Sequence, residues 1–385
     1  MNFFEHQAAA RRSSARLVLL FALAVAGIVL AVDLVAWVAT GSTRTVLFAS
    51  LATIAVIALG SLYRIASLGG GGEPVAQQMG GTPVPENTTD PGLRRLRNVV
   101  EEIAIASGVP VPKLYVLEHE AGINAFAAGY STSDAVVAVT RGALDRLNRD
   151  ELQGVVAHEF SHILNGDMRL NIRLVGVLFG ILMVGLIGRK VLEHARFGGR
   201  GRNVGAILLA ALVALVIGYI GLFFGRMIKA GVSRSRERLA DASAVQFTRQ
   251  ACGLSGALKK IGGLHEGSRL NQRADAEEVS HMLFGDGLGL SGLFATHPPL
   301  LERIRALEPS FAGAELERLK ARWIAAPPDG MQEDLAMGLD GARKSNLPDA
   351  AQRLDVTPPM VAAQVASPAA DDYRRADTIV ASLPA

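Results

Sequence analysis

Four long apolar runs constrain this chain more than any other feature, because runs of this length must enter a protein core or a lipid bilayer. Residues 17–39 contain one charge, Asp33, and are long enough to cross the hydrocarbon layer. Residues 46–62 are near the lower length limit, and we interpret the pair as a transmembrane hairpin within residues 1–66. A signal peptide is the alternative for the first run. That run, however, is long, lacks a convincing small-residue cleavage site and is closely followed by the second run.

A second apolar pair lies at residues 172–187 and 204–225. The latter run is long enough to span, whereas the former is short, so it either spans with little tilt or forms a buried core helix. Arginines precede the first hairpin and few cations lie inside it, so we expect the N terminus and the following domain to be cytoplasmic. The basic loop between the later runs opposes this orientation, although cations also follow the second of these runs. We expect a multi-pass protein of a bacterial-type inner membrane.

Composition agrees with a membrane protein in a reducing compartment. Half of the residues are hydrophobic and the mean hydropathy is +0.28, which exceeds the needs of a core. Cys252 is the only cysteine, so neither an internal disulfide nor a thiolate metal cluster is possible. The isoelectric point near 9.1 comes mostly from cations that flank the apolar runs. Anionic lipid explains these cations, and we expect the bilayer, not nucleic acid, as their partner.

The remaining sequence predicts one soluble domain between two irregular segments. Glycine, proline and threonine dominate residues 67–92, which we interpret as a flexible linker. Helical periodicity and short apolar strands follow, so residues 93–310 are expected to form a domain that the second apolar pair interrupts. Residues 311–385 are rich in alanine, proline and charge, which predicts a partly disordered tail with one helix at 315–325.

Residues 158–162 read H-E-F-S-H within a segment that has helix start and stop signals. Asn148 can cap the start, and Asn165-Gly166 supplies a left-handed ending. On a helix, His158 and His162 lie on one face and can reach one metal ion. Glu159 then lies beside that ion, in the arrangement of a zinc hydrolase.

A catalytic zinc site needs a third protein ligand. A third histidine in the register H-x-x-G-x-x-H is excluded, because Asn165 and Met168 occupy those positions. The other common ligand is a glutamate from a separate helix. Glu237 is the best candidate, since Asp241 follows one turn later and can accept the free ring N–H of a ligand histidine. Taken alone, the two acids could equally neutralise the neighbouring arginines on a solvated helix.

Four segments support a more specific interpretation. They are A-H-E-F-S-H-I-L-N-G-D-M around the motif, N-A-F-A at 124–127, S-R-S-R-E-R-L-A-D-A-S-A at 233–244, and T-H-P-P at 296–299 followed by E-R-I at 302–304. In this order, over residues 90–307, they resemble the HtpX and CAAX-prenyl-protease family of membrane zinc metallopeptidases. The resemblance implies an α+β fold, a mainly helical zincin-type domain with a small sheet and transmembrane helices. It also implies one zinc ion per chain.

The resemblance also implies residue roles. His158, His162 and Glu237 would be the zinc ligands, and Asp241 would support a ligand histidine. Glu159 would be the general base, which accepts a proton from the attacking water and returns it to the leaving amine.

Two weaker candidates complete the site. His297 is a candidate donor to the oxyanion of the reaction, and the alternative is a histidine that caps the helix starting near Pro298. Asn124, Ala125 and Phe126 are candidates for an edge strand that pairs with the substrate backbone, and the alternative is an ordinary edge strand.

The sequence therefore predicts a membrane zinc endopeptidase with a cytoplasmic catalytic domain that cleaves misfolded or excess membrane proteins. The expected partners are protein or peptide substrates and the bilayer. One alternative is C-terminal processing of specific or prenylated substrates. Another is a zinc-binding membrane scaffold without turnover, which Glu159 disfavours because a scaffold needs no general base. The sequence L-D-G at 339–341 resembles a motif of intramembrane proteases, but no apolar run surrounds it.

Overall fold

The structure is a computed structural model of the chain, and it describes residues 3–67, 69–195, 204–271, 282–285, 295 and 297–339. The chain divides into two units, Met1–Met337 and Gly338–Ala385. Only Gly338 and Leu339 of the second unit are described, so most of the predicted tail, and Asp340 and Gly341 of the L-D-G sequence, lie outside the described residues. The basic loop at 196–203 and Thr296 also lie outside them.

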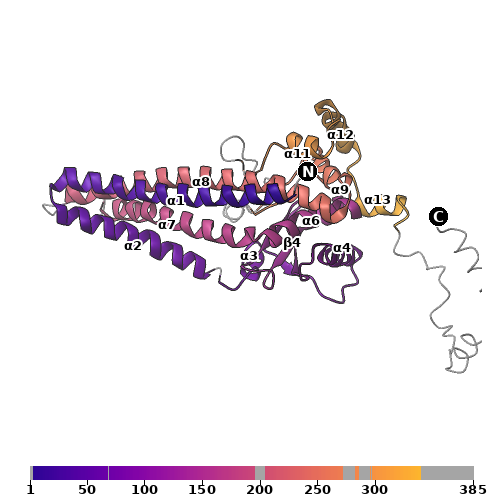
Figure 1. The fold of residues 1–385 in the computed structure, drawn as a ribbon, viewed down its shortest axis with the longest axis horizontal. Helices are drawn as coiled ribbons and strands as arrows, with labels where there is room; N and C mark the ends of the chain where they lie inside the picture. Colours follow the sequence, from indigo (N-terminus) through magenta and orange to yellow (C-terminus); the bar gives the residue numbers. More distant parts are fainter. Residues whose placement is uncertain are drawn as a thin grey trace, which may run out of the picture. The chain divides into compact units, whose positions relative to one another are not determined.

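Four helices of the first unit are long and apolar enough to cross a membrane (Figure 1). They are α1 (Phe3–Thr40), α2 (Thr43–Ser67), α7 (Asp167–Ala195) and α8 (Val204–Thr248). The third candidate span covers Asp167–His194, so it is longer than the predicted run at 172–187. The helix α7 gains this length because it begins directly after Gly166. Its central position explains why half of its span window is buried inside the protein.

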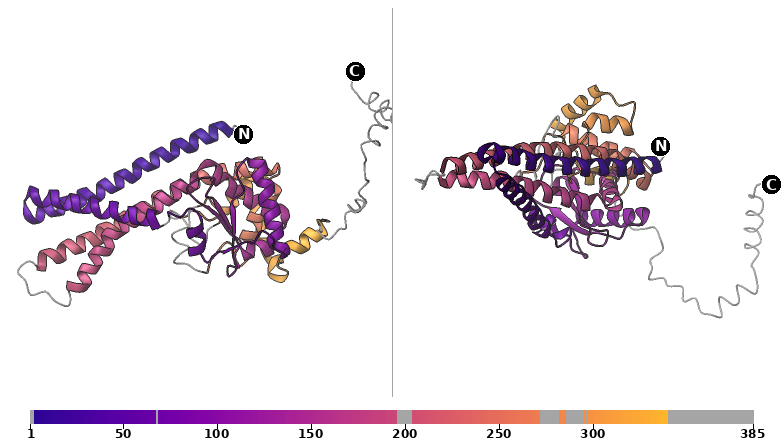
Figure 2. Two further views of the ribbon diagram at one scale, coloured as in Figure 1. Left: turned by 90° about the horizontal axis from the view of Figure 1, so that it is seen from below. Right: turned by 60° about the vertical axis from the view of Figure 1, so that its left-hand side comes forward.

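Glycines let α7 approach its neighbours closely. The helices α1 and α2 form one hairpin and α7 and α8 a second, with α2 against α7 and α1 against α8 (Figure 2). A Cβ atom built on Gly180 of α7 would lie 2.3 Å from the backbone oxygen of Ile57 and 2.3 Å from Ser61 Oγ on α2. A Cβ on Gly218 of α8 would lie 2.4 Å from the backbone nitrogen of Gly185 on α7. Such small-residue contacts are typical of helix packing in membranes.

Replacement of Gly180 by leucine is expected to lower the midpoint of thermal unfolding in detergent. The new side chain would meet backbone of α2, so the helices must separate, at a cost of roughly 1–3 kcal/mol. Gly27→Leu is the matched control, because a Cβ on Gly27 meets no atom within 4 Å. Equal midpoints for the two variants would contradict this packing.

A four-stranded sheet forms the centre of the domain outside the four apolar helices, in the order β1-β2-β4-β3. The strands are β1 (Thr82–Pro83), β2 (Lys113–Leu117), β3 (Ala125–Ala128) and β4 (Val136–Thr140). The pair β2 and β4 is parallel, whereas β1 with β2 and β3 with β4 are antiparallel. The fold is therefore α+β and mainly helical, as predicted.

Both faces of this sheet are covered, which explains why β3 and β4 are buried along their whole length. Alternate side chains of a strand point to opposite faces. One set, which includes Val137 and Val139, packs in the main core with α4 (Pro91–Ser107) and α6 (Arg149–Asn165). The other set, which includes Phe126 and Val136, packs against residues of α3 (Glu73–Gln78) and the start of α7. The sheet thus joins the motif helix to the membrane helices.

The prediction of a flexible linker at 67–92 was wrong. Val75 and Ala76 of α3 are buried, and β1 pairs with β2. Gly72 donates its N–H to the backbone oxygen of Asp134, and a Cβ on Gly72 would lie 2.3 Å from the backbone oxygen of Ala128. Glycine serves here for close backbone approach, not for flexibility, and composition alone does not distinguish the two uses.

The compact unit continues past residue 310, where the predicted domain ends, to Met337. Beyond α5 (Arg141–Arg146), α9 (Cys252–Gly263) and α11 (Leu300–Leu307), the structure has α12 (Gly313–Ala325) and α13 (Gly330–Ala336). The predicted helix at 315–325 corresponds to α12. Asp334 of α13 accepts hydrogen bonds from Arg95 Nη1 at 2.6 Å and from the backbone of Arg149 at 2.7 Å. The first part of the predicted tail is therefore packed against the start of α6.

Candidate metal centre

The motif helix α6 forms where its local signals predict. Asn148 Oδ1 accepts from the Glu151 backbone at 3.0 Å, and Glu151 Oε2 accepts from the Asn148 backbone at 2.9 Å. This reciprocal capping box fixes the N terminus. Gly166 ends the helix with a φ of 69°, in the left-handed region that favours glycine. Between these ends, His158 and His162 lie one turn apart on one face.

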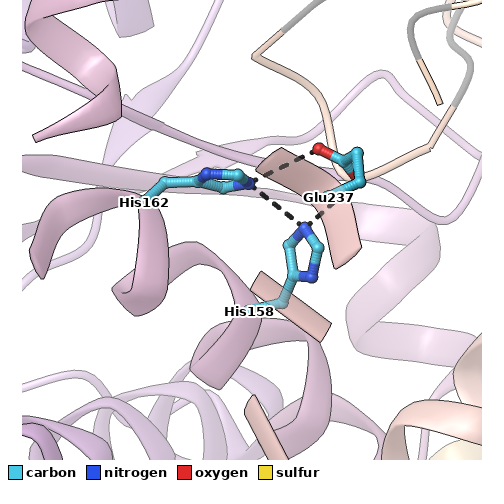
Figure 3. Close-up of side chains that lie close together, drawn as sticks. All are labelled: His158, His162 and Glu237. Carbon is cyan, nitrogen blue, oxygen red and sulfur yellow. Dashed lines mark hydrogen bonds and ion pairs between the residues drawn. The ribbon is translucent and has the colours of Figure 1, made fainter. Parts of the chain in front are cut away.

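Three side chains converge beside α6, two from this helix and one from α8 (Figure 3). His158 Nε2 lies 3.2 Å from His162 Nε2. Glu237 Oε2 lies 3.5 Å from His158 Nε2, and Glu237 Oε1 lies 3.6 Å from His162 Nε2. Two imidazoles and one carboxylate are a donor set of catalytic zinc sites.

The charges around these atoms favour a cation. Carboxylates lie 2.9 Å from His158 Nδ1 and 2.8 Å from His162 Nδ1, which favours a proton on each Nδ1 atom and leaves the Nε2 atoms toward each other. Burial lowers the pKa of both imidazoles, but Glu237 outweighs it and the pKa of each is raised. Glu237 Oε2 is buried without a hydrogen bond among the described residues. The residues therefore fit a metal ion.

Two aspartates lie beside the Nδ1 atoms of the histidines, on the side away from the cluster of Nε2 atoms. Asp241 Oδ1 lies beside His158 Nδ1, although the two are not aligned for a hydrogen bond. Arg303 donates to both oxygens of Asp241, at 2.7 and 3.0 Å. Burial opposes ionisation of Asp241, but Arg303 outweighs it and lowers the pKa of this carboxyl. Asp167 Oδ2 is hydrogen-bonded to His162 Nδ1 and its other oxygen forms an ion pair with Arg236.

Sequence reasoning missed Asp167 and Arg303, although both lie in the segments that carry the resemblance. A signal for Asp167 was present, because an acid that follows the helix-ending Gly166 is one short turn from His162. Arg303 gave no such signal, because it reaches Asp241 from a helix 62 positions away in the sequence.

Glu159 lies beside the cluster with no exposed surface. Neither of its carboxylate oxygens forms a well-aligned hydrogen bond with a described residue, although the backbone of Ala127 lies close enough to favour the ionised form. Burial raises the pKa of this carboxyl, and the nearby His162 and His158 only partly oppose the shift. A buried carboxylate whose pKa is raised is suited to accept a proton and release it again.

His297 reaches the cluster, but its ring already has a partner. Its Nε2 donates to the backbone oxygen of Leu283 at 2.6 Å and lies 3.5 Å from Glu237 Oε2. Burial lowers the pKa of this imidazole, so it is neutral at pH 7. The alternative role as a helix cap does not apply, because α11 has Pro299 at its N-cap position and no side-chain cap.

The structure differs from the expectation of a free edge at Asn124, Ala125 and Phe126. Phe126 forms a bridge with Leu283, and the Phe284 backbone donates to the Ala125 oxygen at 2.8 Å. Asn124 is fully buried. Its Nδ2 donates to the backbone oxygens of Ser268 and Gly285, so the side chain holds the segment 282–285 in place. That segment comes from far along the chain, which local sequence patterns do not reveal.

Comparisons with known proteins agree with this centre. The model of peptidase family M48 matches residues 93–310. The chain is 40% identical to the protease HtpX homolog of Caldanaerobacter subterraneus subsp. tengcongensis over 222 residues, which cover 55% of this chain and 71% of the relative. It is 40% identical to the protease HtpX homolog of Dictyoglomus thermophilum over 213 residues, which cover 55% of this chain and 68% of the relative.

A solved structure is also similar, the crystal structure of Ste24p from S. mikatae, at 15% identity and a TM-score of 0.38. This likeness covers 78% of this chain and 66% of that one. Four apolar helices and a histidine–glutamate cluster define a membrane metallopeptidase. The chain belongs to peptidase family M48, in agreement with the HtpX and CAAX-prenyl-protease resemblance of its motifs.

Proposed function

We propose that this metallopeptidase is a zinc-dependent endopeptidase of a bacterial-type inner membrane that hydrolyses misfolded or excess membrane proteins on the cytoplasmic side. The observation that carries the proposal is the convergence of ligand atoms from His158, His162 and Glu237 within 4.8 Å of one another. Glu159, which forms no well-aligned hydrogen bond with a described residue, lies beside them.

Each residue has a distinct role in this proposal. His158, His162 and Glu237 would hold one zinc ion, which when bound polarises a carbonyl group and lowers the pKa of water. Glu159 accepts a proton from the attacking water and returns it to the leaving amine. Asp167 holds the His162 ring in orientation through a hydrogen bond, and Asp241 places a negative charge beside Nδ1 of His158. His297 can donate to the oxyanion only after its Nε2–H turns away from the Leu283 oxygen.

The position of the site supports membrane proteins as substrates. The span of α8 ends at Ile228, and Glu237 follows on the same unbroken helix, about 14 Å further along the axis. On the other side, only Gly166 separates α6 from the start of α7. Both helices that provide the cluster therefore lead directly into candidate spans. Arginines before the first span and after the last support a cytoplasmic catalytic domain.

The test is cleavage by the detergent-purified protein supplied with zinc. An unfolded membrane polypeptide without lipid is expected to be cut by the wild type and not by Glu159→Gln. A prenylated peptide that ends in a CAAX sequence is the comparison substrate. Cleavage of the prenylated peptide alone would favour C-terminal processing, and no cleavage of either by wild type would favour a zinc-binding scaffold.

Asp167→Asn is expected to weaken zinc binding by about 10- to 100-fold. An asparagine holds the His162 ring less firmly, and it no longer favours the tautomer with the proton on Nδ1 and a free lone pair on Nε2. The measurement is competition for zinc with a chromophoric chelator. Asp145→Asn is the control, since Asp145 is exposed and lies away from the cluster. Equal zinc affinities of the two variants would show that Asp167 does not act on the site.

A further inference from the structure

A cavity of 880 Å³ adjoins the metal cluster through His297 and Arg303, both of which line it. His297 Nε2 lies 3.5 Å from Glu237 Oε2, and Arg303 Nη1 lies 3.6 Å from the same oxygen. The two side chains therefore contact the cavity and the proposed zinc ligand at once. The volume is within the range of about 300–1,000 Å³ that is typical of ligand sites.

The cavity carries positive charge that the described residues do not neutralise. Its lining includes Arg234, Arg269 and Lys320, and no acidic side chain among the residues the structure describes. Arg303 is neutralised by Asp241, and Arg234 Nη1 donates to the Ala295 backbone oxygen at 2.5 Å. Arg269 and Lys320 are exposed and have no ion pair with a described side chain.

The rest of the lining is mainly apolar, with Leu258, Ile261 and Leu300 among its side chains. An apolar wall favours the aliphatic or aromatic part of a ligand. The exposed cations at the rim favour a carboxylate at the end of the same ligand. A peptide segment with an apolar side chain and a nearby carboxylate has both of these features.

We propose that this cavity binds the part of the peptide substrate next to the scissile bond, and that Arg269 and Lys320 select a carboxylate there. An acidic side chain or the C-terminal carboxylate of the peptide can supply this group. The inference rests on the proposed endopeptidase function, because it identifies the substrate class of the same site. Both cations are exposed, so the selectivity comes from screened ion pairs and decreases as salt increases.

The test uses a peptide that the wild type cuts, with its cleavage site mapped by mass spectrometry. Glutamate or glutamine is placed at each position near the scissile bond, and in a second set the C terminus is free or amidated. Wild-type kcat/KM is expected to favour a carboxylate at one position about fivefold, the size of one exposed ion pair. The first set detects a side-chain carboxylate and the second a terminal one.

The double variant Arg269→Glu/Lys320→Glu is expected to remove or invert this preference while the neutral peptide is still cut. Arg322→Glu is the matched control, because Arg322 is an exposed cation on the same helix as Lys320 but does not line the cavity. Equal wild-type kcat/KM values for the charged and neutral peptide of every pair would overturn the proposal. A preference for the carboxylate that persists in the double variant would also overturn it.

A binding measurement distinguishes failure of this inference from failure of the proposed peptidase function. The Glu159→Gln protein is titrated with the same peptides carrying a fluorophore, and anisotropy gives Kd without turnover. Tighter binding of the carboxylate peptide, lost in the double reversal, supports the cavity even if no peptide is cut. Equal Kd values for the charged and neutral peptides overturn it, whether or not the wild type is an active peptidase.

Discussion

Glu159→Gln is expected to abolish peptide hydrolysis and, at the same time, to raise the stability of the metal-free protein at neutral pH. Loss of a positioned general base typically costs about 10²- to 10⁴-fold in rate. The ligand residues remain, so bound zinc is expected to be unchanged. The measurements are kcat on an unfolded polypeptide and metal content of the purified protein. Cleavage at the wild-type rate would show that Glu159 is not the base.

The stability gain follows from the raised pKa of the Glu159 carboxyl. Burial raises this pKa, so the folded protein binds the proton more tightly than the unfolded chain does. Stability is therefore lost as pH rises from the pKa of the unfolded chain toward the raised pKa of the folded state, so this carboxyl lowers stability at pH 7 relative to pH 4. Glutamine does not titrate and removes this loss.

The difference in Tm between variant and wild type, both without metal, is expected to be small at pH 4 and larger at pH 7. Glu101→Gln is the control, because Glu101 forms only a half-exposed pair with Arg97. A variant that is less stable than wild type at pH 7 would contradict the buried-charge argument.

The parts of the site that the sequence predicted are those that local rules control. The start of α6 depends on Asn148 and Glu151, three positions apart, and the two histidines are one turn apart on the same helix. Glu237 could not be identified as the third metal ligand from spacing alone, because an acid near arginines can equally be a surface residue that neutralises them. Its assignment depended on the order of four segments, and its place beside the histidines depends on the contact between α6 and α8.

The parts that were not predicted depend on contacts between distant residues. Local sequence marks a glycine-rich segment but not the Ala128 oxygen that Gly72 must approach. Nor does it show that residues 282–285 fill the edge of β3 beside Ala125. The transmembrane run and the Glu237 helix were predicted as separate elements, yet α8 is continuous, because no proline or cap interrupts its sequence. Its continuity places Glu237 on the same helix as the candidate span, about 14 Å beyond the end of that span.

Lys260→Met is expected to destabilise the fold by roughly 3–5 kcal/mol, the typical cost of leaving a buried charge without its partner. Lys260 is 3% exposed, and its Nζ lies 2.6 Å from Glu151 Oε2 and 2.6 Å from Glu333 Oε2. It thus joins the cap of the motif helix to α13. Burial raises the pKa of the Glu151 carboxyl, and Lys260 opposes that shift. Without the lysine, Glu151 must be protonated or remain as a buried charge.

The adjacent lysine provides the control for this experiment. Lys259→Met removes a cation from the same helix, but its partner Glu308 is 39% exposed, so a loss of about 1 kcal/mol or less is expected. Both variants are compared by thermal unfolding in detergent. Adding Glu151→Gln to Lys260→Met is expected to restore part of the stability, because it removes the uncompensated charge. Equal losses in the two lysine variants, or no recovery in the double variant, would show that Glu151 does not depend on Lys260. Because Glu151 also caps the helix that carries His158 and His162, zinc retention is expected to fall in parallel with stability.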